Sequence, residues 1–143
     1  MTRSRAVILG LAGRADEAEA ELARLPMPPA DLEDKEKFDL ERALLGPRSA
    51  IAGARGDLEG AVGALRAFLA EDKKRDAGDF PFYPGTFRLR VRLADALVQL
   101  GRPDEARKEL QPVLAVNPRF APALEVIARI EGRPSAATGS AGR

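Results

Sequence analysis

The sequence predicts an all-α fold built from antiparallel helical hairpins, and three observations support the prediction. The phrase Gly-x4-Ala-x3-Leu occurs three times along the 143 residues. On either side of the phrase, apolar residues recur at the i, i+3, i+4, i+7 spacing of a helix that buries one face. No segment shows the strict apolar–polar alternation that is typical of a strand.

The repeated phrase is expected to join two helices at each of its occurrences. Its glycines are Gly13, Gly56 and Gly101, spaced 43 and 45 residues apart. Each glycine is predicted to end a helix in the left-handed backbone region, which only glycine adopts freely. Asp57 suits the N-cap of the next helix, and Pro103 suits a first helical position. The small Ala of the phrase allows close helix crossing, with the Leu one turn further along the same face.

The apolar periodicity predicts the helices in order, at residues 4–12, 15–25, 31–45, 48–55, 58–72, 87–100, 103–116 and 120–131. A break is expected at Gly46 and Pro47, because proline lacks an amide hydrogen and clashes with the preceding turn. Neighbouring amphipathic helices with short connections pair into antiparallel hairpins, here 4–25, 31–72 and 87–116, with a cap helix at 120–131. The tail at 132–143 has no apolar periodicity and is expected to be disordered.

The strongest family signal lies in residues 87–131. The residues that carry it are Leu93, Ala94, Leu97, Gly101, Ala106, Leu110, Val113 and Pro118. In this register the segment resembles a tetratricopeptide repeat, with Arg90 where the family has Trp. The segment 121–131 resembles the first helix of a further repeat, acting as a terminal cap. The resemblance implies one repeat domain over residues 1–131, a short superhelix of stacked hairpins with a C-terminal capping helix.

The resemblance also implies a function. Tetratricopeptide domains are protein–protein interaction scaffolds, so the chain is expected to bind a peptide or helix of a partner protein in a concave helical groove. An alternative is an accessory or regulatory domain of a larger enzyme, sensor or secretion assembly, because the first copy of the phrase begins inside its first helix. Repeat proteins with few units expose apolar ends, so a homo-oligomer through these ends is also considered.

Composition argues against several other functions. The chain has no Cys and no His, so it lacks the usual zinc ligands and any thiolate nucleophile. No catalytic, metal-binding or cofactor-binding residue is predicted, and the chain is not expected to be an enzyme. An enzyme using carboxylates alone is the remaining catalytic alternative, although no acidic pair stands out.

Charge and hydropathy bear on partners and compartment. The chain carries 23 Lys and Arg residues against 22 Asp and Glu residues, without the basic excess of a nucleic-acid binder. The longest apolar stretch, residues 6–13, is far short of the roughly 20 residues of a membrane-spanning helix. No membrane insertion is therefore predicted. The absence of Cys fits the cytoplasm, with a periplasmic or exported location as the alternative if the chain is a fragment.

Two groups of residues are candidates for partner binding. Arg88 and Arg92 lie one helical turn apart on a helix that lines the concave groove in the tetratricopeptide family. Some family members hold a peptide's terminal carboxylate with basic residues at these two positions, and guanidinium groups bind carboxylates bidentately. Asp95 and Gln99, further along this helix, are included in the candidate surface. The alternative interpretation is a solvated face whose arginines are balanced by Asp95 and nearby acids.

The second group lies in the connection at residues 71–86, which is longer than a regular repeat requires. Phe82 and Tyr83 stand between prolines there. Exposed aromatic residues on a long connection can form a ledge for a partner. The alternative is that these rings fold back and cover an open end of the helices.

Overall fold

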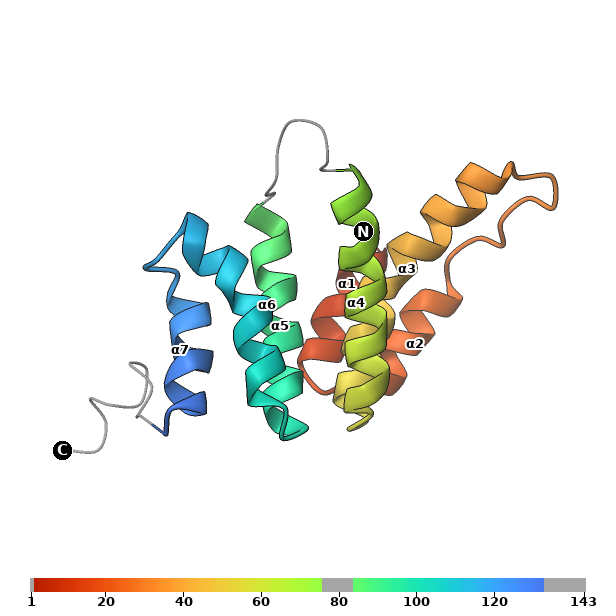
Figure 1. Ribbon diagram of the computed structural model, residues 1–143. Coiled ribbons are helices and arrows are strands. Elements are labelled where there is room, and N and C mark those ends of the chain that lie inside the picture. The colour runs from red at the N-terminus through yellow and green to blue at the C-terminus, as the bar shows by residue number, and fades with distance from the viewer. Residues whose placement is uncertain (1, 76–83, 133–143) are drawn as a thin grey trace. The chain divides into compact units, whose positions relative to one another are not determined.

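The computed structural model describes residues 2–75 and 84–132 of the chain. These residues form helices and connecting turns, without a strand (Figure 1). The helices are α1 (Thr2–Leu11), α2 (Ala15–Ala23), α3 (Asp34–Ala54), α4 (Leu58–Arg75), α5 (Pro84–Gln99), α6 (Pro103–Val116) and α7 (Ala121–Ile130). The predicted all-α class is therefore confirmed. The chain divides into two compact units, Met1–Arg75 and Asp76–Arg143, which are described separately below.

The three marker glycines end helices as predicted. Gly13, Gly56 and Gly101 have φ angles of 78°, 77° and 73°, in the left-handed region where a side chain would be strained. The N–H of Gly13 donates to the Gly10 carbonyl at 3.0 Å, and the N–H of the next residue reaches back to Leu9 at 2.9 Å. The same pair of hydrogen bonds follows Gly56 and Gly101. This Schellman geometry satisfies carbonyls that a helix end otherwise leaves unpaired.

The helix that follows each marker glycine begins in one of two ways. At α4, Asp57 is the N-cap, and its Oδ1 accepts the Gly60 N–H at 2.9 Å, as predicted. At α2 and α6 the N-cap position is an arginine, Arg14 or Arg102, which makes no side-chain cap. α6 begins at Pro103, which confirms the expected first helical position.

The arginine at these two N-cap positions instead forms a bidentate ion pair with the glutamate three residues later. Arg14 donates to the two carboxylate oxygens of Glu17 at 2.6 and 2.5 Å. Arg102 donates to those of Glu105 at 2.6 and 2.8 Å. The shared sequence Gly-Arg-x-Asp-Glu-Ala thus contains its own ion pair. This pair was not predicted, although its i, i+3 spacing is present in the sequence.

The predicted break at Gly46 and Pro47 is wrong, because α3 continues through both residues. Gly46 has no Cβ, which removes one of the clashes that a residue before proline normally makes in a helix. The hydroxyl of Ser49 donates to the Gly46 carbonyl at 2.7 Å. Pro47, Ser49, Ala50 and Ile51 are all buried, so tertiary packing stabilises the helix across the proline.

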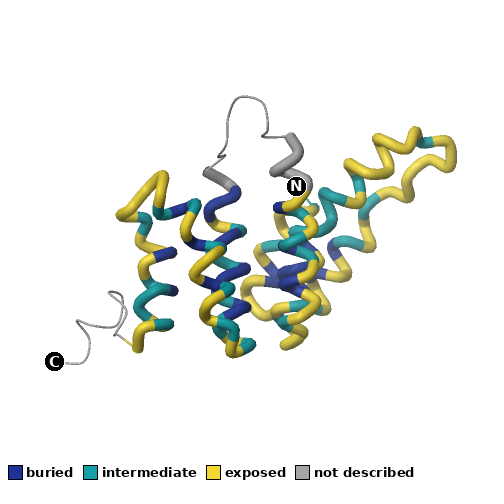
Figure 2. The backbone as a smooth tube through the Cα atoms, in the orientation of Figure 1, coloured by how far each residue is buried: buried dark blue, intermediate teal, exposed yellow. Residues whose placement is uncertain are grey.

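In the first unit, α3 packs against α1, α2 and α4. Its core between α1, α2 and α3 comprises Ala6, Leu9, Ala18 and Ile51, with Ala15 and Leu22 packed against it. α1 and α3 cross so closely that a Cβ on Gly10 would lie 2.7 Å from the Cβ of Ala50. The first turns of α3 are mostly exposed, and burial begins in its second half (Figure 2).

In the second unit, α5 and α6 form an antiparallel hairpin, and α7 packs against both (Figure 1). The most buried side chains come from all three helices: Leu93, Leu97, Leu110, Val113 and Val126. The rings of Phe87 and Phe120 meet edge to face, 5.8 Å apart, and tie the start of α5 to the connection before α7. This unit is a helical hairpin followed by a helix, α7, that packs on it.

Several predicted boundaries need correction. α4 continues to Arg75 and α5 begins at Pro84, so the connection predicted at residues 71–86 is helical at both ends. The cap helix predicted at 120–131 is α7, residues 121–130. Most of the predicted disordered tail at 132–143 lies outside the described residues. The single repeat domain predicted over residues 1–131 stays a prediction.

Candidate functional site

α5 places four of the six candidate residues on one face. Arg88, Arg92, Asp95 and Gln99 follow the i, i+4, i+7, i+11 spacing of a single helical stripe. Arg88 and Gln99 are exposed, whereas Arg92 and Asp95 are half-buried. The other two candidates, Phe82 and Tyr83, lie outside the described residues.

Asp95 connects this stripe to α7. Its Oδ2 accepts a hydrogen bond from the Gln99 amide at 3.0 Å. Its Oδ1 forms an ion pair with the Arg129 guanidinium, which comes from the last turn of α7. Arg129 was not among the predicted site residues. The sequence indicates it only indirectly, because the first helix of a further repeat is expected to pack beside the first helix of the preceding one.

The five residues Arg88, Arg92, Asp95, Gln99 and Arg129 are called the arginine face below. It contains three guanidinium groups and one carboxylate, so it is net positive. Partial burial lowers the pKa of the Arg92 guanidinium, because desolvation disfavours the charged form. Arginine nevertheless stays protonated at neutral pH, since its ordinary pKa is so high. A partly desolvated guanidinium beside exposed ones favours a carboxylate-bearing ligand.

Arg90 lies between these arginines in sequence but has a different role. It is only 8% exposed, and its Nη1 donates to Glu109 Oε2 of α6 at 3.2 Å. Among the described residues, no acceptor is within hydrogen-bonding distance of its Nε. Arg90 therefore joins the two helices of the hairpin from inside, at the position where the family has Trp.

A second polar region lies in the first unit, at the start of α2. A hollow of about 420 Å³, open to solvent, is lined by Gly13, Arg14, Ala15, Asp16, Glu17 and Arg55. Arg55 reaches it from the end of α3 and contacts Glu19 at 2.8 and 2.6 Å and Asp16 at 3.1 Å. These hydrogen bonds raise the pKa of Arg55. The charges around this hollow are already matched with one another, so it is a poor site for a charged ligand.

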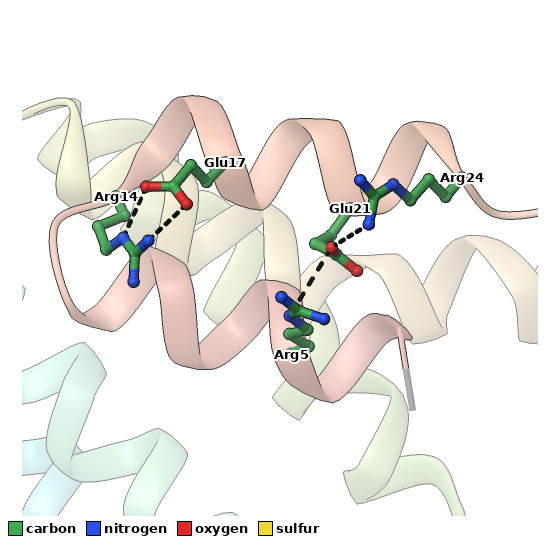
Figure 3. A network of polar contacts seen from close by, with 5 residues as sticks. All are labelled: Arg5, Arg14, Glu17, Glu21 and Arg24. Carbon is green, nitrogen blue, oxygen red and sulfur yellow. Dashed lines mark hydrogen bonds and ion pairs between the residues drawn. The ribbon is translucent and has the colours of Figure 1, made fainter.

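Figure 3 shows the neighbouring ion pairs of α1 and α2. The hydrogen bonds from Arg14 hold the pKa of Glu17 below its ordinary value, and Glu17 raises the pKa of Arg14 in turn. The Glu21 carboxylate is largely buried and lies 3.7 Å from Arg5 of α1 and 2.7 Å from Arg24 (Figure 3). The Arg5–Glu21 ion pair joins α1 to α2, whereas the Arg14–Glu17 and Arg24–Glu21 pairs are local to α2 and its two ends.

Residues 2–75 and 84–132 hold no group of three or more His, Cys, Asp or Glu side chains arranged to bind a metal ion. Every helix in this part of the chain is too short or too polar to cross a membrane.

A sequence model of the tetratricopeptide repeat matches residues 54–130, more than half of the chain. The chain belongs to the tetratricopeptide repeat family. The match begins before residue 87, so this repeat protein carries the family pattern from the end of α3 onward, through α4 as well as the second unit. No curated protein and no solved structure matches the chain. Tetratricopeptide repeats are in general non-enzymatic modules for protein–protein interaction.

Proposed function

We propose that this tetratricopeptide repeat protein is a scaffold that holds an acidic peptide or helix of a partner protein against the arginine face. The observation that carries the proposal is the positive stripe on α5, extended onto α7 through the ion pair between Asp95 and Arg129. Arg88 is exposed at one end of the stripe and free of the hairpin's interior. A planar guanidinium there can take a carboxylate through two parallel hydrogen bonds.

The geometry favours binding over catalysis. The arginine face supplies hydrogen-bond donors and one carboxylate that is already engaged by Gln99 and Arg129. It presents no nucleophile and no pair of carboxylates for acid–base chemistry. The chain is therefore proposed to be non-enzymatic, and the cytoplasm remains its proposed location.

A synthetic peptide array tests the proposed ligand class. Acidic peptides are compared with copies in which each Asp or Glu is replaced by Asn or Gln. The protein should prefer the acidic set, and Arg88→Ala/Arg92→Ala should lose that preference with affinity falling about tenfold or more. The control Arg107→Ala/Lys108→Ala removes the same charge from exposed positions of α6 and should behave like the wild type. Equal binding of both peptide sets by the wild type would contradict the proposal.

Self-association is a second proposal, supported by exposed apolar side chains. Ile8 and Leu11 of α1 are 66% and 60% exposed, and Val116 of α6 is 53% exposed. Contact between such surfaces of two copies would remove apolar area from water. Light scattering across a concentration series should show a mass above 15.3 kDa that falls towards the monomer on dilution. A monomer at every concentration would rule it out.

A further inference from the structure

The connection between α2 and α3 is longer than its task requires. It runs over residues 24–33, ten residues, whereas the equivalent connection between α6 and α7 needs only the four residues 117–120. In the shorter connection Phe120 is half-buried and packs on Phe87. In the longer one the middle residues are exposed. Long connections whose side chains stay exposed commonly carry binding functions.

The exposed middle of this connection reads Pro-Met-Pro-Pro, residues 26–29. These four residues have no regular secondary structure. Met27 is 91% exposed, the most exposed large hydrophobic side chain of the described residues. A fully solvated methionine between prolines does nothing for the core, yet it offers apolar area to a partner.

Steric rules alone restrict the shape of this segment. Proline fixes φ near −65° at Pro26, Pro28 and Pro29. A residue that precedes a proline is pushed into the extended or polyproline region, which applies to Leu25, Met27 and Pro28. The segment therefore loses little conformational entropy when it is bound as a left-handed polyproline helix, the property that such recognition exploits.

The charged residues beside the prolines indicate which charge a partner's groove should carry at its rim. Asp31 and Glu33 follow the prolines, and both are exposed, whereas the charge of Asp34 is matched by Lys37 at 3.9 Å. On the other side, the charge of Arg24 is already matched by Glu21 at 2.7 Å. The net field beside the segment is negative, so a complementary partner carries basic residues beside its groove.

We propose that residues 26–29 are a polyproline recognition segment, bound by a partner domain whose groove has an aromatic floor and a basic rim. Prolines at positions 26 and 29 fit the Pro-x-x-Pro spacing of such ligands, in which the two prolines stack on the aromatic floor. The segment belongs to the first unit and does not involve the arginine face, so it is independent of the proposed scaffold function.

The test titrates the fluorescently labelled chain with a panel of isolated Src-homology-3 and WW domains chosen because basic residues flank their grooves. At least one domain should bind, and Pro26→Ala/Pro29→Ala should weaken that binding by about tenfold or more. The matched control is Pro118→Ala, an exposed proline of the shorter connection, which should leave the affinity unchanged. Binding by none of the domains overturns the proposal, as does equal binding by the wild type and the double variant.

Met27→Asp guards against an effect on folding. Because Met27 is almost fully exposed, its replacement should leave the circular dichroism spectrum and melting temperature unchanged. A polyproline helix has three residues per turn, so Met27 lies beside the face that Pro26 and Pro29 share. The aspartate would remove the apolar contact of Met27 with the side of the groove and should still weaken the binding. If Met27→Asp binds as well as the wild type, the segment does not enter the groove and the proposal fails.

Discussion

Gly10 shows most clearly how a single residue limits the packing of the first unit. Any Cβ at this position would lie 2.7 Å from the Ala50 Cβ and 2.8 Å from its carbonyl carbon, closer than the helices can tolerate. Gly10→Ala should therefore destabilise the protein by about 1–3 kcal/mol, the usual cost of overpacking. Urea denaturation measures the change.

The matched control for Gly10 is Gly63→Ala in α4, where an added Cβ would meet no atom within 4 Å. This exposed helical position should gain up to about 1 kcal/mol, because alanine favours the helix over glycine. If Gly10→Ala is as stable as the wild type or more stable, the close crossing of α1 and α3 does not limit the packing of the first unit.

The lowered pKa of Glu17 predicts that the stability of the protein depends on pH. Its pKa is lowered in the folded state by the hydrogen bonds from Arg14, so its contribution to stability is present above the unfolded pKa of about 4.3. The contribution is lost as the pH falls through the lower folded pKa. The stability difference between the wild type and Glu17→Gln should therefore shrink as the pH is lowered from 7 towards about 3. Urea midpoints at several pH values measure it, and a constant difference would refute the assignment.

At the residue scale, the sequence predicted what depends on local chemistry. The left-handed glycines and the Asp57 cap follow from backbone sterics and short-range hydrogen bonds, and all were confirmed. The pairing of Asp95 with Arg129 was not predicted, because it joins helices whose relative position depends on packing.

At the element scale, the N-cap of α4 can be tested by itself. Asp57→Ala removes the side-chain acceptor for the Gly60 N–H and should cost about 1 kcal/mol. Asp31→Ala removes the same charge from an exposed site outside the helices and should change stability much less. Thermal unfolding of the two variants compares them, and equal losses would mean that the cap does not stabilise α4.

The α5–α6 hairpin contains a buried ion pair whose removal should depend on which partner is lost. Glu109→Ala leaves the buried Arg90 without its carboxylate and should cost roughly 1–3 kcal/mol. Arg90→Leu/Glu109→Leu replaces both charges with apolar groups and should be less destabilising, since buried ion pairs often contribute little net stability. Denaturant titrations of the two variants measure the difference. If the double variant were the less stable one, the pair would be a net stabiliser.

Helix boundaries also show what a sequence alone leaves open. The break at Gly46 and Pro47 was predicted from local rules, but burial of the surrounding turn carries α3 through it. The helix predicted at 58–72 ends instead at Arg75, and the helix predicted from residue 87 begins instead at Pro84, because proline suits a first helical position. At Gly46 and Pro47, by contrast, local propensity failed because tertiary contacts decide the structure.

At the scale of the whole molecule, periodicity and the repeated phrase sufficed to predict the family. The match over residues 54–130 covers the second and third copies of the phrase, while the first copy lies outside it. The first copy nevertheless ends α1 and begins α2, just as the other two copies of the phrase each end one helix and begin the next. The partner could not be predicted in the same way, because binding surfaces consist of exposed residues that folding does not constrain.

The central claim is that the arginine face holds a protein partner, and quantitative affinity capture from cells tests it most directly. Immobilised wild type, Arg88→Ala/Arg92→Ala and Arg107→Ala/Lys108→Ala are compared by mass spectrometry under the same salt conditions. We expect a set of proteins that the wild type and the α6 control retain equally and that the α5 variant loses. Equal retention by all three would contradict it, and equal loss by both double variants would show that net charge alone, not this face, attracts the partner.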